Sequence, residues 1–219
     1  VIALDPKYPR GYVLLAQIYL WDILLGTTES PEKSLAKAKD LAEKAIALDN
    51  SESTAHGLLG SIYLMSRQHD EAITQVERAI SLNPNDASNS IRLGFVLLNS
   101  GRPQEAISAL KNHRRLNPIP SQQYYLQLVT AYRLSGQHKE AIETGKEALR
   151  QVPNNINIYL QLTAAYLMMG REEEARAAAI DVMKMNPKFS LEWYAKTIYF
   201  KNQNDIDETI DALRKAGLK

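Results

Sequence analysis

The chain contains no cysteine, which excludes disulfide bonds, thiolate metal sites and cysteine nucleophiles together. It also lacks an excess of either charge, because 26 basic and 25 acidic residues leave a formal net charge of +1. No overall field therefore favours nucleic acid or an anionic membrane surface. The longest apolar stretch, from Gly11 to Gly26, is too short to cross a bilayer and has Gln17 and Asp22 in its middle. We expect a cytoplasmic protein that does not insert into a membrane.

Motifs of catalysis are missing as well. No GxxxxGKS/T or GxGxxG phosphate loop and no GxSxG nucleophile turn occurs. The three consecutive acidic residues from Glu172 to Glu174 point in different directions on a helix, so they cannot converge on one bond. We therefore expect no enzyme activity, no catalytic residues and no cofactor.

Patterns for a metal or a nucleic-acid site are equally weak. The four histidines are His56, His69, His113 and His138, and no two of them have the four-residue spacing of a helical metal pair. The basic cluster at residues 113–115 is not continued by further basic residues with interleaved aromatics. The sequence predicts no metal site and no nucleic-acid partner.

What the sequence does have is a phrase that recurs at nearly constant spacing. It reads VIALDP at Pro6, AIALDN at Asn50, AISLNP at Pro84, HRRLNP at Pro118, EALRQVP at Pro153 and VMKMNP at Pro187. From Asn50 onward, successive end points are 34, 34, 35 and 34 residues apart. A period of this length is typical of stacked helical hairpins, in which each unit packs only on its neighbours. The spacing predicts an all-α solenoid whose function is binding.

Within one repeat, small and apolar residues at helical spacing define two helices. In residues 53–84, Gly60 and Tyr63 lie on one face of a first helix, and Ala72 and Val76 lie on one face of a second. Gly60 and Ala72 are expected where the two helices approach most closely, because a larger side chain would force their axes apart.

Local chemistry marks the helix ends. Gly101, Gly136 and Gly170 stand just past first helices, where a residue in the left-handed conformation can satisfy the last carbonyl groups. The Asn-Pro pairs of the recurring phrase stop second helices, because proline restricts the residue before it and has no amide hydrogen. The residues expected to cap the next first helices are Asp86, Ser121 and Ser190.

These residues resemble the signature of the tetratricopeptide repeat family. That signature has a large residue, Leu, a small residue and Tyr in the first helix, then Ala, an apolar residue and Ala in the second, with a closing Pro. The large position is filled by Tyr12, His56, Tyr125, Tyr159 and Trp193, but by Ser90 in the third hairpin. The resemblance covers nearly the whole chain and implies a right-handed superhelical solenoid of antiparallel helix hairpins.

The recurring phrase predicts a single array over residues 1–219. Residues 1–6 are the expected tail of a truncated preceding repeat, residues 7–50 an extended repeat and residues 188–219 a divergent C-terminal capping repeat. The regular repeats between them are expected at residues 51–84, 85–118, 119–153 and 154–187.

The runs at residues 24–49 and 189–219 carry a narrower resemblance. They are similar to tetratricopeptide tails of bacterial multidomain proteins that contain adenylate or guanylate cyclase-type or winged-helix modules. This resemblance implies a protein–protein interaction scaffold or regulatory arm of a larger bacterial protein. One alternative is a sensor that transmits partner binding to an upstream cyclase-like or transcriptional domain. Another is a self-association module, with a homo-oligomer formed through the N-terminal end.

Stacked hairpins expose their first helices on a concave wall, where we expect a peptide or partner helix to bind. The wall residues that mix amide, arginine and apolar side chains are Arg10, Gln17, Ser61, Arg92, Phe95, Asn99, Gln127, Arg133, Asn157 and Gln161. Because arginine pairs with carboxylates, an acidic amphipathic segment is the expected ligand. An inert wall that only supports the solenoid is the alternative. The family's two-carboxylate clamp is not expected, since only Arg92 matches it.

Overall fold

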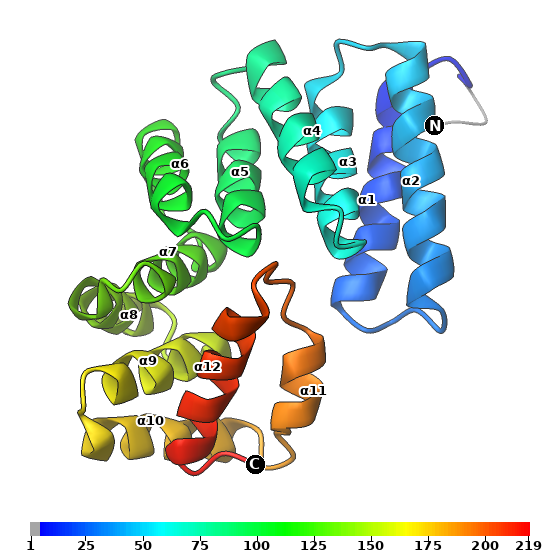
Figure 1. Cartoon of the computed structure of the whole chain (residues 1–219). Coiled ribbons are helices and arrows are strands. Elements are labelled where there is room, and N and C mark those ends of the chain that lie inside the picture. The colour runs from blue at the N-terminus through cyan, green and yellow to red at the C-terminus, as the bar shows by residue number, and fades with distance from the viewer. Residues whose placement is uncertain (1–4) are drawn as a thin grey trace. The chain divides into compact units, whose positions relative to one another are not determined.

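The computed structural model describes residues 5–219, and these residues form twelve α-helices and no β-strand (Figure 1). Most of the expected helix tail at residues 1–6 lies outside the described residues. The first helices of successive hairpins are α1 (Pro9–Leu24), α3 (Ser53–Met65), α5 (Ala87–Asn99), α7 (Gln122–Leu134) and α9 (Ile156–Met168). The second helices are α2 (Pro31–Leu48), α4 (His69–Leu82), α6 (Pro103–Leu116), α8 (His138–Gln151) and α10 (Glu172–Met185). The short α11 (Leu191–Lys196) and α12 (Gln203–Lys215) follow.

The chain divides into two compact units, Val1–Val96 and Leu97–Lys219, with the boundary inside α5. In the first unit α1 pairs with α2 and α3 with α4, and α2 also contacts α3. In the second unit α7 pairs with α8 and α9 with α10, while α6 contacts α7 and α8 contacts α9. Each unit is therefore built in the same way, with a second helix packed against the first helix of the next hairpin.

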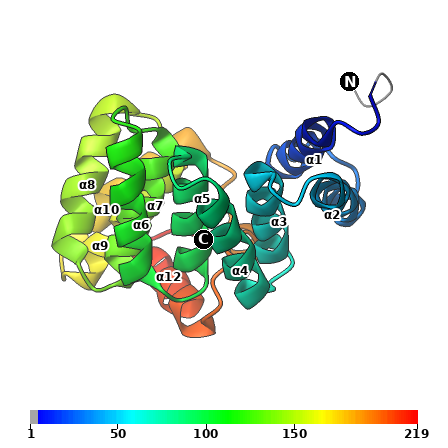
Figure 2. The same cartoon turned by 90° about the horizontal axis from the view of Figure 1, so that it is seen from above.

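The first hairpin is longer than the regular ones. Helices α1 and α2 have 16 and 18 residues, whereas α3 and α4 have 13 and 14. The two long helices lie side by side in both views (Figures 1 and 2). Pro31 opens α2, where a missing amide hydrogen is harmless, and Gly26 takes a positive φ of 67° in the turn between them.

Small side chains let the helices approach closely. Ala38, Ala42 and Ala45 of α2 are wholly buried in the core of the first unit. A Cβ atom added to Gly60 would lie 2.4 Å from Cγ2 of Val76 and 2.9 Å from the backbone oxygen of Ala72, so the expected close approach of α3 and α4 is confirmed. In the second unit, a Cβ atom at Gly145 would lie 2.6 Å from Cδ2 of Leu162, which packs α8 closely against α9.

The turns inside the hairpins share one conformation. Gly101, Gly136 and Gly170 have φ angles of 77°, 76° and 70°, as the sequence predicts. The residue after each of them donates its amide hydrogen to a carbonyl five residues earlier, which satisfies the end of the first helix. In the turn between α3 and α4, Arg67 takes this place with a φ of 57°, so a side chain stands in a conformation that favours glycine.

The expected helix caps are present as well. The hydroxyl groups of Ser121 and Ser190 accept hydrogen bonds from the amides of Tyr124 and Trp193. The carboxylate of Asp86 accepts the amide of Ser88 at 2.8 Å. Each bond satisfies an amide at a helix start that has no partner within the helix.

The last two helices depart from the regular pattern. Helix α11 has six residues, and α12 lies against α9 (Figure 1). The amide of Leu191 donates to the carbonyl of Lys219 at 2.8 Å, which closes residues 190–219 into a compact C-terminal hairpin. Trp193 is 65% exposed although its repeat position predicts packing, whereas Tyr125 at the same position of α7 is buried. The difference arises because α11 ends after six residues and does not run the length of a regular first helix.

Candidate functional site

In the first unit, the expected wall residues differ in their exposure to solvent. Arg10 is exposed, and Gln17, Ser61, Arg92 and Phe95 are half-buried. The hydroxyl of Ser61 donates to the carbonyl of Gly57 within its own helix. Phe95 packs against the core formed by residues of α3, α4 and α5. Burial lowers the pKa of Arg92, with an opposing effect of the Asp86 charge.

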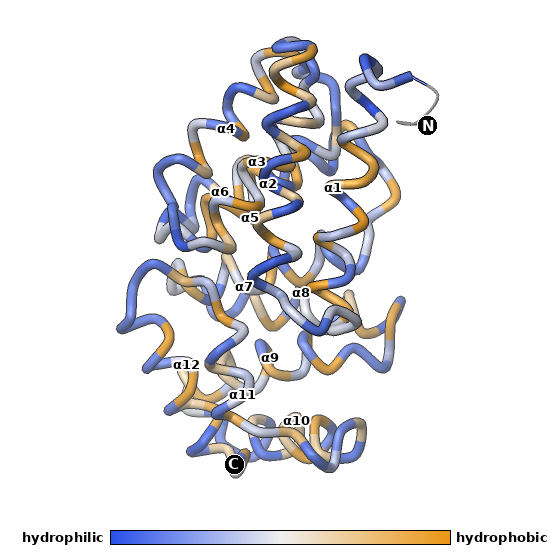
Figure 3. The backbone as a smooth tube through the Cα atoms, turned by 90° about the vertical axis from the view of Figure 1, so that its right-hand side faces the viewer, coloured by the Kyte–Doolittle hydropathy of each residue, from blue (hydrophilic) through white to orange (hydrophobic). Residues whose placement is uncertain are grey.

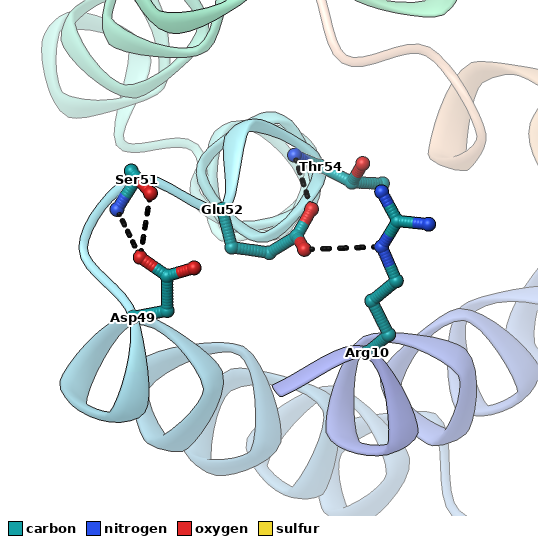
Figure 4. A network of polar contacts seen from close by, with 5 residues as sticks. All are labelled: Arg10, Asp49, Ser51, Glu52 and Thr54. Carbon is teal, nitrogen blue, oxygen red and sulfur yellow. Dashed lines mark hydrogen bonds and ion pairs between the residues drawn. The ribbon is translucent and has the colours of Figure 1, made fainter. Parts of the chain in front are cut away.

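Arg10 belongs to a polar network at the start of α3 (Figure 4). Its Nε donates to Glu52 at 3.3 Å, and the same carboxylate accepts the amide of Thr54 at the start of the helix. Asp49 accepts hydrogen bonds from the amide and the hydroxyl of Ser51 in the preceding turn. Exposed ion pairs of this kind contribute about 0–1 kcal/mol. Arg10 therefore contacts the residue that caps α3, and this contact gives it a structural role at the start of that helix.

In the second unit, four of the expected wall residues are buried, namely Asn99, Gln127, Arg133 and Gln161. Asn157 is exposed. The sequence predicts an open wall here, and the burial corrects that expectation. The C-terminal hairpin accounts for part of this burial, since α12 lies against α9, which carries Gln161, and the amide of Lys201 donates to the carbonyl of Asn99 at 2.7 Å.

A polar cluster, in which Arg133 and Gln161 are buried and Glu208 is exposed, joins the wall to this hairpin. We call it the Arg133 cluster, and its members are Arg133, Gln161, Tyr194, Asp205 and Glu208. Nε of Arg133 donates to Oε1 of Gln161 at 2.8 Å, and Nε2 of Gln161 donates to the hydroxyl of Tyr194 at 3.2 Å. Arg133 is only 2% exposed, yet its buried Nη2 has no hydrogen-bond partner among residues 5–219.

The charges of this cluster are only partly compensated. Burial lowers the pKa of Arg133, while Tyr194, Asp205 and Glu208 act in the opposite direction. Burial raises the pKa of Asp205, the Glu208 charge raises it further, and Arg133 lowers it. The two carboxylates thus stabilise the guanidinium at a distance, but within residues 5–219 no ion pair joins them to it.

A second pair of side chains occupies the same register one repeat earlier. Asn99 and Gln127 precede Arg133 and Gln161 by 34 residues each. Gln127 is 3% exposed, and neither atom of its side-chain amide has a hydrogen-bond partner in the described part of the chain. A buried amide with no partner loses its hydration without compensation, which is uncommon in folded proteins. Both register pairs thus retain unused hydrogen-bonding capacity.

An apolar ridge on α1 is a separate feature of the first unit. Its exposed side chains at helical spacing are Leu14, Ile18 and Trp21, and they are continued by Leu25 directly after the end of the helix. Figure 3 shows hydrophobic colour along much of this helix. The residues of α3 that lie 44 positions later than Leu14 and Ile18 are Leu58 and Ile62, and both are buried in the core against α1 and α2. Equivalent positions of the two helices are therefore buried on α3 and exposed to solvent on α1.

Residues 5–219 contain neither a metal-binding cluster nor a membrane-spanning helix. No group of three or more histidine, aspartate or glutamate side chains lies together as a metal site would require. None of the helices in this range is both long and apolar enough to cross a membrane.

Paired antiparallel helices at this period define a helical-hairpin repeat protein, a class whose surfaces bind other proteins. Sequence models of the tetratricopeptide repeat match residues 53–86, 91–156 and 132–196. The chain belongs to the tetratricopeptide repeat family, and this family supports a role as a scaffold for protein–protein interaction. A comparison with curated proteins found no match.

Solved structures show the same fold at low sequence identity. PilW, described as a widely conserved type IV pilus biogenesis factor, is similar with a TM-score of 0.73 and 17% identity, over 95% of this chain and 88% of PilW. TTC0263, a thermophilic tetratricopeptide protein of Thermus thermophilus, has a TM-score of 0.64 and 20% identity, over 94% and 99% of the two chains. YrrB, described as a tetratricopeptide protein with an unusual peptide-binding site, has a TM-score of 0.61 and 22% identity, over 89% and 95%.

Proposed function

We propose that the chain binds an acidic, amphipathic peptide or partner helix on the first helices of its hairpins. The observation that carries this proposal is Arg133, a buried guanidinium with an Nη2 group that no residue pairs among those described. A buried charge without a close counter-ion has lost its hydration without full compensation, which is unfavourable. A carboxylate from a ligand would relieve this through charge-assisted hydrogen bonds to the guanidinium.

The neighbouring amides suit the rest of such a ligand. Gln127 has both a donor and an acceptor without a partner in the described part of the chain, so it matches the needs of a polar group on a bound peptide. The first unit, taken by itself, has a partly buried cation, Arg92, and a half-buried aromatic side chain, Phe95, on the same first helix. YrrB, which is similar in fold, is described as having a peptide-binding site, and this supports the choice of a peptide as ligand.

The two ends of the chain support a role within a larger protein. Their resemblance to tetratricopeptide tails of bacterial multidomain proteins favours a scaffold or regulatory arm. If an upstream cyclase-type or transcriptional domain is present, the same binding event would serve as its sensor input. Self-association is the second candidate, and the exposed ridge of Leu14, Ile18, Trp21 and Leu25 favours it, because soluble proteins rarely expose contiguous apolar surface without a partner.

The test measures peptide binding directly. A fluorescein-labelled helical peptide built from leucine, alanine and glutamate is titrated with the protein, alongside a version in which lysine replaces glutamate. We expect tighter binding of the acidic peptide, and weaker binding of it by Arg133→Met. Lys111→Met, a change of the same type at an exposed position of α6, should bind like the wild type. Equal binding of both peptides, or loss of binding in Lys111→Met alone, would exclude the proposed site.

A further inference from the structure

The C-terminal hairpin resembles the ligand that the wall is proposed to bind. Helix α12 buries Ile206, Ile210 and Leu213 on one face. Its sequence, QNDIDETIDALRK, has four acidic and two basic residues, so the segment is acidic and amphipathic. Two of the acidic residues, Asp205 and Glu208, act on the charge of Arg133.

We infer that residues 190–219 are an internal occupant of the Arg133 cluster, and that a partner's acidic helix binds there by displacing them. This inference rests on the proposed function, because it names what regulates access to the same site. Without that ligand, the hairpin would be only a structural cap.

The hairpin reaches both register pairs of the wall. The hydroxyl of Tyr194 accepts from Gln161 at 3.2 Å, and the amide of Lys201 donates to the carbonyl of Asn99 at 2.7 Å. These contacts lie on hairpins of different repeats, so the segment spans the part of the wall where a ligand helix would lie.

The C-terminal hairpin does not pair all of the buried hydrogen-bonding groups of the wall. Nη2 of Arg133 and both polar atoms of Gln127 stay without partners among residues 5–219 while the hairpin is in place. Asp205 and Glu208 attract the guanidinium but do not form an ion pair with it. A partner helix whose carboxylate reaches Nη2 would gain a charge-assisted bond that α12 does not make. This difference gives the partner an advantage in the exchange.

The hairpin has contacts of its own in addition to those with the wall. Its two ends are held together by the bond from the amide of Leu191 to the carbonyl of Lys219. The ring of Phe189 packs against Tyr194 with centroids 5.9 Å apart, and α11 contacts α12. These contacts do not involve Asn99 or Gln161, so the proposed displacement of the hairpin from the wall does not require breaking them. Only molecules with an undocked hairpin could then bind the ligand. The apparent affinity should therefore equal the intrinsic affinity multiplied by the undocked fraction.

A reversible lock tests the displacement. The backbone hydrogen bond brings the backbones of residues 99 and 201 close together, so Asn99→Cys with Lys201→Cys is the locking variant, and loss of free thiol on oxidation verifies its disulfide. The chain has no other cysteine, and the wild type under the same oxidant is therefore a clean control. We expect the oxidised variant to bind the glutamate peptide at least about tenfold more weakly than its reduced form, with fold preserved by circular dichroism.

An opening variant provides the second arm. Asp205→Asn with Glu208→Gln removes the attraction to Arg133 and should tighten binding of the glutamate peptide several-fold, on the order of three or more. The matched control is Asp207→Asn with Asp211→Asn, two exposed carboxylates on the same helix, which should leave binding unchanged.

The outcomes separate the two ideas. If the oxidised lock binds as tightly as the reduced form and the opening variant gains nothing, internal occupancy is wrong while peptide binding stands. If neither the wild type nor the opening variant binds the glutamate peptide, the proposed function itself fails. Should the cysteine variant not fold, the opening variant and its matched control still decide the question.

Discussion

Arg133 and Gln161, which are 28 residues apart in the chain, meet through one hydrogen bond between Nε of the arginine and Oε1 of the glutamine. That bond uses one of the five donors of the guanidinium, and it leaves Nη2 buried without a partner among residues 5–219. A group that is required for folding would be expected to have its bonds completed inside the protein. Because the pairing of Arg133 is incomplete, we expect a substitution of this residue to affect ligand binding more than stability. The two effects can be measured independently.

Arg133→Met should not destabilise the protein. Methionine has a similar volume and removes a buried charge that no ion pair compensates within the described residues, so we expect the free energy of unfolding to stay the same or to rise by about 1 kcal/mol. Urea denaturation followed by circular dichroism checks this, with Lys111→Met as the exposed control. A loss of several kcal/mol in Arg133→Met alone would mean that the guanidinium is a structural group.

Gln127→Leu should stabilise the second unit. Both polar atoms of the amide are buried without partners in the described chain, so an apolar side chain of similar size removes an uncompensated desolvation. We expect a gain of about 1–3 kcal/mol in urea denaturation. Gln123→Leu, at an exposed position of the same helix, is the control and should change stability little. A loss of stability in Gln127→Leu would show that the amide has a partner in solution.

Gly60→Ala should destabilise the first unit. The added Cβ atom would lie 2.4 Å from Cγ2 of Val76 and 2.9 Å from a backbone oxygen, so α3 and α4 must move apart. Overpacking of this kind costs about 1–3 kcal/mol, and a thermal melt should show the loss. Ser61→Ala, the next residue on the same helix, should be much milder. Equal melting temperatures for the two variants would contradict the close approach.

Protonation of His138 should lower stability. Burial lowers the pKa of His138 in the folded protein below its ordinary value of 6.5, and the charge of Arg133 lowers it further. The unfolded chain therefore takes up this proton more readily, so the stabilising contribution is complete above pH 6.5 and is lost as pH falls through the lower folded value. In His138→Gln the free energy of unfolding should decline less than in the wild type as the pH falls from above 6.5 into the acidic range. If the two proteins lose stability in parallel, protonation of His138 does not contribute to the pH dependence.

Any self-association should depend on the ridge of α1. Ile18→Glu with Trp21→Glu places charge on the exposed apolar side chains, so oligomers formed there should dissociate. Size-exclusion chromatography at two concentrations measures the change. The control is Ile119→Glu, since this side chain is exposed outside the ridge. Oligomers that persist in the double variant but dissociate in the control would place the contact elsewhere.

The sequence predicted those parts of the fold that local chemistry determines. Glycines at the ends of first helices, serine caps and the Asn-Pro stops act within a few residues, so Gly136, Ser121 and their equivalents could be placed without a structure. The close approach at Gly60 could be predicted as well, because a small residue is needed where two paired helices meet.

The candidate site was predicted less well, because it depends on a contact between distant segments. Arg133 and Gln161 could be assigned to the wall from their register, but the docking of α12 on α9 leaves no periodic signal. The sequence predicts residues 188–219 only as a divergent capping repeat. The negative charges of α12 are complementary to Arg133. This relationship could be recognised only once the structure placed Asp205 near the guanidinium.

The two register pairs of the wall differ in one respect. Thirty-four residues before the guanidinium of Arg133, the equivalent position holds the neutral amide of Asn99. The wall of the second unit is therefore electrically asymmetric along its length, with the cation in only one of its two register pairs. A helix with carboxylates near one terminus would satisfy Arg133 in one direction of insertion and would bury its charge against amides in the other. For the ligand helix proposed above, the register of the repeats would set not only where it lies but also which way its chain runs.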